Sequence, residues 1–195
     1  MFALRHTARS FIGSTRAVAA IEFAMIMPVL LLLFLGSFDA GNAIAVYMKV
    51  RAATYSLGAI ANQYSTGNAG ISTTTMTSIT GATAAILAPY STTPTVVVIS
   101  QIKATSNTQA IVSWSYSQGG TALTQGGTYS GLPANFAKNT CGGTYPCYAI
   151  AASVSYTYTP MFGSFITGPL TLSDSLYTTP RVSACVQYNS VPSSC

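Results

Sequence analysis

Few residues in this chain could do acid–base chemistry. Its 195 residues include three carboxylates, Glu22, Asp39 and Asp174, and a single histidine, His6. Serine is plentiful, but a serine nucleophile needs a positioned base, and neither a G-x-S-x-G motif nor a serine–histidine–acid arrangement is present. Metal sites need clustered oxygen ligands or closely spaced Cys and His, which the sequence does not offer. We therefore expect a protein that is not an enzyme, with no catalytic residue, no metal and no cofactor.

Glu22 stands out among these acids because it immediately precedes the uncharged, apolar run from Phe23 to Phe38. As a helix this run would reach about 24 Å, which is short of the roughly 30 Å hydrocarbon core of a bilayer. Extension to Met48 gives ample length for a transmembrane helix. Pro28 removes one backbone hydrogen bond and should bend this helix near its start.

Charges on either side of the apolar run bear on its orientation. Arg5, Arg9 and Arg16 precede the run and favour a cytoplasmic N-terminus, whereas Lys49 and Arg51 follow it and weaken that argument. The other basic residues are scattered, so the net charge of +5 forms no basic stripe and predicts no binding of nucleic acid. We expect Asp39, near the outer face, to pair with one of the two following cations or with water.

Four cysteines lie far beyond the apolar run: Cys141, Cys147, Cys185 and Cys195. None forms a C-x-x-C pair, and an even number in a domain outside the cytosol indicates disulfides. Three pairings are possible. We favour Cys141–Cys147 and Cys185–Cys195, because each closes a short, turn-rich loop. Because disulfides form outside the cytosol, the cysteines also favour an orientation with the C-terminal domain outside the cytoplasm.

The segment AVAAIEFAMIMPVLLLLFLGSFDAGNA resembles the N-terminus of TadE-like proteins, the pseudopilins of the Tad (tight adherence) pilus, a branch of type IV pili. VAAIEF, from Val18 to Phe23, carries the most specific part of the resemblance. The family pattern makes Val18 the first residue of the mature protein and Ala17 the last residue of a leader. Prepilin peptidases usually cut after Gly, and Gly13 is out of register with Glu22. Farther along, Ser153–Gly163 (SVSYTYTPMFG) resembles a strand and turn of the family.

The resemblance implies a minor pilin or pseudopilin that primes, caps or anchors a pilus used for surface adherence. Its expected place is the bacterial inner membrane, crossed once, with incorporation into the pilus as a further expectation. Expected partners are a prepilin peptidase, other pilins and pilus assembly proteins. Glu22, followed by Phe23, would set the register by neutralising the new ammonium group of Val18 in a neighbouring subunit. Alternatively, Glu22 lies solvated at the cytoplasmic interface without a partner.

Two other functions are compatible with the sequence. An uncleaved, membrane-anchored adhesin would keep its leader and use the outer domain to bind a surface or glycan. A secreted hydrolase would be released by signal peptidase near Ile44, because Gly41 and Ala43 could mimic its cleavage site. The lack of acid–base residues argues strongly against the hydrolase.

The pattern of the chain predicts an α+β fold in three parts: a basic leader (1–17), a transmembrane and extended helix (18–64) and an extracytoplasmic domain (65–195). In the extended helix we expect a packing face of Ala52, Tyr55, Leu57, Ala59 and Ile60. A helix at 73–88, with a face of Met76, Ile79, Ala82, Ala85 and Ile86, ends at Pro89.

Four stretches of the outer domain predict an antiparallel sheet of about four strands with helices on one face: 93–105, 109–117, 148–160 and a last strand within 168–188. We expect the aromatic residues Trp114, Tyr116, Tyr156 and Tyr158 to pack across these strands rather than to bind a ligand. The long loop 118–140, in which Lys138 is the one charged residue, is the more plausible contact for a partner.

Overall fold

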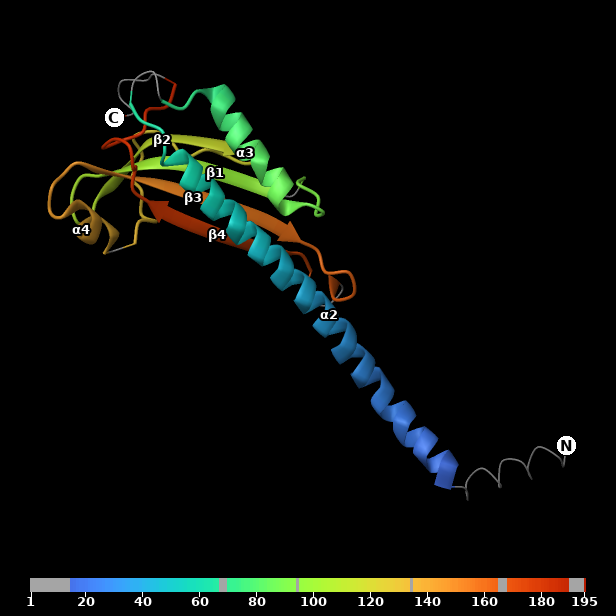
Figure 1. The fold of residues 1–195 in the computed structure, drawn as a ribbon. Helices are drawn as coiled ribbons and strands as arrows, with labels where there is room; N and C mark the ends of the chain where they lie inside the picture. The colour runs from blue at the N-terminus through green and yellow to red at the C-terminus, as the bar shows by residue number, and fades with distance from the viewer. Residues whose placement is uncertain (1–14, 67–69, 94, 134, 165–167, 190–194) are drawn as a thin grey trace, which may run out of the picture.

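In the computed structural model, a single long helix leads into a small domain built on one sheet (Figure 1). The structure describes residues 15–66, 70–93, 95–133, 135–164, 168–189 and 195. Most of the expected leader, including Arg5, His6, Arg9 and Gly13, lies outside these residues. The helices described are α2 (Thr15–Ala61), α3 (Thr73–Leu87) and α4 (Phe136–Cys141). This arrangement confirms the predicted α+β class with a long N-terminal apolar helix.

The sheet has four antiparallel strands in the order β2-β1-β3-β4. Their bounds are β1 Thr95–Ala104, β2 Ala110–Gln118, β3 Cys147–Tyr158 and β4 Leu170–Thr178. Both α2 and α3 lie across one face of the sheet (Figure 1). The sequence therefore predicted the number and direction of the strands correctly.

The C-terminal half of α2 packs on the sheet through a stripe of residues spaced by three or four. Fully buried members of this stripe are Val46, Val50, Ala53, Leu57 and Ala61. The predicted face is largely wrong, since Ala52, Tyr55 and Ala59 are exposed and only Leu57 of the predicted set is buried. Small and apolar residues occur on every side of this helix, so composition alone does not mark the side that meets the sheet.

The helix α3 begins at an N-cap, where Ser72 Oγ accepts a hydrogen bond from the Thr75 amide at 3.1 Å. Its buried residues are Met76, Ile79, Thr80, Thr83 and Leu87. The predicted face is thus wrong at Ala82 and Ala85, which are exposed. Burial of Thr80 is tolerated because its hydroxyl donates to Met76 O at 2.9 Å within the same helix.

Lys49 joins α2 to the end of α3 rather than to Asp39. Its ammonium group donates hydrogen bonds to Ala88 O at 2.5 Å and Ile86 O at 3.3 Å. A cation at a helix C-terminus satisfies free carbonyl groups and matches the helix dipole. Arg51 lies over the ring of Tyr55, 5.6 Å from its centroid.

The four aromatic residues expected to pack across neighbouring strands do not pair with one another: β1 separates β2 from β3, and the half-buried Tyr116, like Trp114, contacts Tyr188. Trp114 is buried, and its indole nitrogen donates to Val186 O at 2.7 Å while the ring stacks on Tyr188. Tyr156 and Tyr158 are also buried. These side chains therefore belong to the core and do not form an open binding face.

Part of the loop 118–140 pairs with the outer strand of the sheet. Gly126 N donates to Val112 O at 2.8 Å, Val112 N donates to Gly127 O at 3.0 Å, and Tyr129 N donates to Ala110 O at 2.8 Å. These bonds cover an edge that would otherwise invite pairing with another chain.

Two disulfides close the turns of the outer domain with the favoured connectivity. Cys141 pairs with Cys147, with Cα atoms 5.7 Å apart, and Cys185 pairs with Cys195 at 5.9 Å. The first links the end of α4 to the start of β3. The second closes the C-terminal segment, whose terminal carbonyl accepts a hydrogen bond from the Tyr148 hydroxyl at 2.6 Å.

Gly58 sets how closely α2 approaches the sheet. A Cβ atom at this position would lie 2.7 Å from Leu176 Cδ2 and 3.7 Å from Ala152 Cβ. We expect Gly58→Leu to lower the stability of the outer domain by about 1–3 kcal/mol, because overpacking forces the helix and sheet apart. Thermal unfolding in detergent, followed by the fluorescence of buried Trp114, measures this loss.

Gly41→Leu is the matched control, because a Cβ atom at Gly41 meets nothing within 4 Å. Replacement of this helical glycine should leave stability unchanged or raise it by up to about 1 kcal/mol. Equal melting temperatures for the two variants would contradict the role assigned to Gly58.

Candidate functional site

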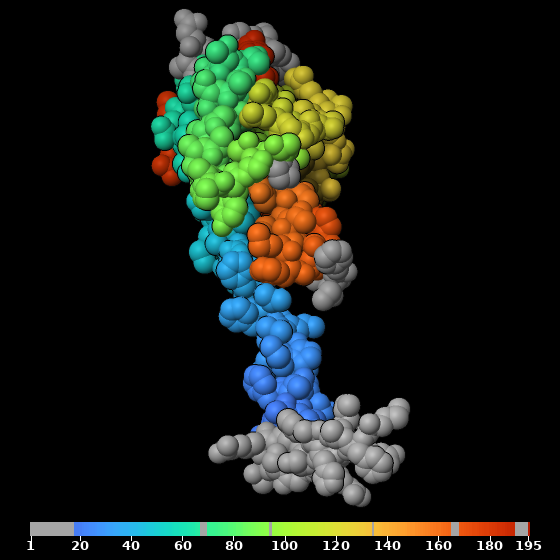
Figure 2. Space-filling model, turned by 90° about the vertical axis from the view of Figure 1, so that its right-hand side faces the viewer, coloured from blue at the N-terminus to red at the C-terminus, as the bar shows by residue number. Residues whose placement is uncertain are grey.

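The N-terminal half of α2 projects away from the outer domain as a solitary helix (Figures 1 and 2). From Val18 to Phe34 every residue is exposed, and the large apolar side chains have exposed fractions of 45–75%. This helix is long and apolar enough to cross a membrane. Contact with the outer domain is established by Phe38, before Met48: the Phe38 ring meets Phe162, and residues beyond it pack on the sheet.

Glu22 is an exposed residue within this solitary stretch. No ion pair or hydrogen bond joins it to any side chain that the structure describes. Val18 lies four residues earlier and Phe23 directly follows, both exposed. The side chain of Ala17 is outside the described part, so processing at Ala17–Val18 stays a prediction. The helix runs through Pro28, and the bend expected there also stays a prediction.

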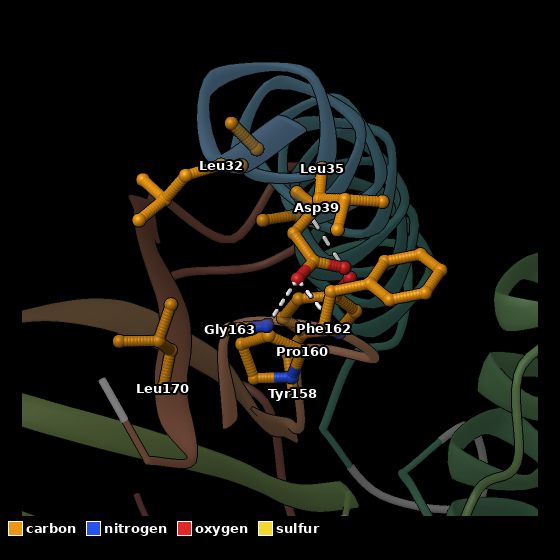
Figure 3. Close-up of a pocket in the computed structure, with 11 residues that line it drawn as sticks. Leu32, Leu35, Asp39, Tyr158, Pro160, Phe162, Gly163 and Leu170 are labelled. Carbon is orange, nitrogen blue, oxygen red and sulfur yellow. Dashed lines mark hydrogen bonds between the residues drawn. The ribbon is translucent and has the colours of Figure 1, made fainter. Parts of the chain in front are cut away.

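Asp39 has a different environment from the one expected for it. The residue is only 6% exposed, and its carboxylate accepts three backbone hydrogen bonds from the turn after β3. The donors are the amides of Met161 at 3.1 Å, Phe162 at 2.9 Å and Gly163 at 2.6 Å. Figure 3 shows Asp39 with Phe162 and Gly163. The expected pairing with Lys49 or Arg51 is therefore wrong.

This arrangement works because a buried carboxylate must be hydrogen-bonded to be tolerated. Three successive amides at a turn form a concave set of donors for an anion, and bonds to a charged acceptor are stronger than neutral ones. The turn in question is part of SVSYTYTPMFG, so two segments singled out in the sequence meet at Asp39. We call the group formed by Asp39 and residues 161–163 the Asp39 clamp.

Tyr158, at the end of β3, lies beside the Asp39 clamp. Its hydroxyl is 3.5 Å from Asp39 O. Burial, and to a lesser extent the Asp39 carboxylate, raises the pKa of Tyr158 above its ordinary value of 10. Because the folded-state pKa is raised, the neutral phenol stabilises the fold below pH 10, and this contribution is lost as the pH rises further.

A mostly apolar cavity of about 320 Å³ opens beside the Asp39 clamp. Residues of α2 line one side of it, and the turn after β3 and the start of β4 line the other (Figure 3). Phe38 and Phe162 contact each other at its edge, with ring centroids 6.0 Å apart. Sequence reasoning did not foresee this cavity.

No group of three or more His, Cys, Asp and Glu residues that could hold a metal ion occurs in the described ranges. Asp174, the other carboxylate of the outer domain, lies on β4. One of its oxygens is buried and has no hydrogen-bond partner in the part of the chain that the structure describes.

Residues 17–56 match the family model described as TadE-like protein. The match covers the solitary stretch, Glu22, Asp39 and most of the packed half of α2, and it confirms the resemblance inferred from the sequence. No curated protein and no solved structure showed significant similarity to the chain.

Removal of the Asp39 carboxylate should release the turn after β3. We expect Asp39→Ala to destabilise this contact by at least about 1.5–3 kcal/mol, the range for hydrogen bonds to charged groups. Hydrogen exchange measured by mass spectrometry should show about tenfold faster exchange, or more, at residues 161–163, since 1.4 kcal/mol corresponds to tenfold.

Asp39→Asn keeps one acceptor oxygen and should give an intermediate increase in exchange. Asp174→Asn removes the other carboxylate of the domain and should leave residues 161–163 as protected as before. Unchanged protection in Asp39→Ala would show that the turn holds its shape without the clamp.

Proposed function

We propose, for a chain whose residues 17–56 are TadE-like, that it is a minor pilin or pseudopilin that primes, caps or anchors a Tad-type pilus used for adherence. It is a structural protein without enzymatic activity. The solitary stretch anchors it in the bacterial inner membrane, with the N-terminus in the cytoplasm and the disulfide-bonded domain outside. Other pilins and pilus assembly proteins are its partners.

One observation carries this proposal: the TadE-like match includes a solitary apolar helix whose acid, Glu22, has no partner among the side chains that the structure describes. Val18 to Phe38 would extend roughly 30 Å at about 1.5 Å per residue, the thickness of the hydrocarbon core. A soluble monomer rarely exposes such a continuous apolar surface. Lipid and neighbouring helices would cover it in a membrane or a pilus.

Glu22 would determine the axial register in which this helix packs against neighbouring helices. A charge at the centre of a membrane helix costs about 2.5–3.5 kcal/mol on insertion scales, and Glu22, closer to one edge of the core, would bear part of this cost. Cleavage after Ala17 would create an ammonium group at Val18, and pairing with Glu22 of a neighbouring subunit would offset much of this cost. Such pairing requires one axial stagger between helices, so Glu22 sets the register of assembly.

The packed half of α2 extends the surface available to neighbouring pilins. On the side away from the sheet, Ile44, Met48 and Tyr55 are 56%, 63% and 47% exposed. Gly41 and Ala52 lie on the same exposed side, and small residues let a second helix approach closely. Lateral packing could therefore continue beyond the membrane.

An uncleaved, membrane-anchored adhesin is the second candidate. It is favoured by Ala17, which stands where prepilin peptidases usually find Gly. Its outer domain would bind a surface while Met1 remained in the cytoplasm. The two candidates differ in the N-terminus of the protein that accumulates in the membrane.

N-terminal sequencing of the membrane-bound protein tests the choice directly. We expect the sequence to begin at Val18 in cells with a prepilin peptidase and at Met1 in cells without one. Met1 in both strains would favour the adhesin. A terminus near Ile44 would instead indicate release by signal peptidase.

Glu22→Ala should leave membrane insertion intact and remove the protein from pili. Removing one charge makes insertion easier, so the amount in the membrane should not fall. Immunoblots of sheared pili and of membranes measure the two quantities. Glu22→Gln separates loss of charge from loss of size.

Ser37→Ala is the matched control on the same helix. The Ser37 hydroxyl donates to Phe34 O at 2.8 Å, so its polar group is satisfied within its own helix. This variant should enter pili at the normal level. Normal incorporation of Glu22→Ala would contradict the assembly role of Glu22.

A further inference from the structure

We propose that the outer domain rests on the lipid bilayer through three exposed apolar side chains, and that the cavity beside them takes a phospholipid acyl chain. The three residues are Phe38 of α2 and Met161 and Phe162 of the turn after β3, and we call them the apolar foot. This contact depends on the membrane anchor but not on entry into a pilus.

The Asp39 clamp fixes the depth of the apolar foot. Asp39 directly follows the apolar run of α2, and its carboxylate holds the amides of Met161, Phe162 and Gly163. The turn is therefore held at the level where the spanning stretch ends. Figure 2 shows this part of the chain, in orange, at the lower edge of the outer domain beside α2.

The side chains of the apolar foot are exposed, although the Asp39 carboxylate holds the backbone amides of Met161 and Phe162. Met161 is 73% exposed, Phe38 is 51% exposed and Phe162 is 45% exposed. Phe38 and Phe162 contact each other, so segments more than a hundred residues apart form one apolar surface. Aromatic side chains at the end of a spanning helix favour the membrane interface.

The cavity extends from the Asp39 clamp toward the membrane. Leu32, Leu35 and Gly36 line it from α2, and Pro160, Phe162 and Leu170 line it from the outer domain. Leu32 lies about 10 Å before Asp39 along the helix axis. One wall of the cavity thus belongs to the spanning stretch.

An acyl chain fits this cavity by size and chemistry. Its volume of about 320 Å³ lies at the lower end of the range for small-molecule sites, about 300–1,000 Å³. Asp39 is the carboxylate that lines the cavity. Because three amides already donate hydrogen bonds to it, it does not require water in the cavity. Because the helical wall continues into the hydrocarbon region, lipid reaches the cavity without leaving the bilayer.

Tryptophan fluorescence in nanodiscs tests the position of the apolar foot. The full chain with Met161→Trp is reconstituted at one copy per nanodisc. The disc lipids are phosphatidylethanolamine and phosphatidylglycerol that carry bromine on the part of the acyl chains nearest the headgroup. We expect the loss of about half of the emission added by the new Trp, because an interfacial ring contacts the labelled chains. Native Trp114, 3% exposed inside the sheet, provides the baseline.

Val182→Trp is the matched control. Val182 is 64% exposed and follows Arg181, whose amide bonds Asn62 O near the end of α2. That end lies about 35 Å along the helix from Asp39. The emission of the Trp introduced at position 182 should be insensitive to brominated lipid and quenched by iodide in the buffer. Phe162→Trp repeats the test if Met161→Trp does not fold, as judged by circular dichroism.

Two outcomes would overturn the proposal. Emission from Met161→Trp that responds to iodide but not to brominated lipid would place the apolar foot in water. If the Met161→Trp emission is protected from iodide only in discs that hold two or more copies, a second copy of the chain covers the apolar foot instead of lipid.

A photocrosslinker tests the cavity separately. With benzoylphenylalanine at Leu170, which is 39% exposed at the start of β4, irradiation should attach one phospholipid. Mass spectrometry identifies the adduct. The same group at Val182 should give none. Equal lipid attachment at the two positions, or none at Leu170, would rule out an acyl chain in the cavity.

Discussion

The buried carboxylate of Asp39 is the constraint on which the rest of the structure depends. A charge that is 6% exposed must be compensated, and three amides of the turn after β3 compensate it. This requirement ties the start of the packed half of α2 to a turn more than a hundred residues away. It fixes where the solitary helix ends and where the domain begins, and it thereby fixes the level of the cavity and the apolar foot.

The helix α2 has to satisfy two different environments in one continuous element. Before Asp39 it exposes apolar side chains on all sides, as a membrane or a bundle requires; after Asp39 it buries one stripe under the sheet. Gly58 allows close approach to Leu176, and Lys49 joins the helix to the end of α3. The packed half therefore ties the continuous helix α2 to the domain.

The sequence predicted those features that have a local pattern. Alternating and β-branched strands, the Pro89 stop of α3 and the favoured cysteine pairs all correspond to the structure. The packing faces of α2 and α3 were wrong because small residues and threonines lie on all sides, and Thr80 can be buried once its hydroxyl bonds its own helix. The partners of Asp39 are backbone amides, which no residue type reveals. The segment 153–163, singled out in the sequence by its resemblance to a family turn, was nevertheless a signal that could have directed attention to them.

The two acids that flank the apolar run can now be distinguished by physical argument. Asp39 is satisfied inside its own chain, whereas Glu22 has no partner among the described side chains. The helix between them rises about 25 Å, so a membrane surface at Asp39 places Glu22 just inside the far edge of a roughly 30 Å hydrocarbon core. At that depth a carboxylate bears part of the cost that a charge has at the centre of the membrane, and the partner proposed to offset it would come from outside the described chain. The fold thus ties one acid to the outer domain and leaves the other exposed about 25 Å away along the helix, where the assembly role proposed for it would require a partner.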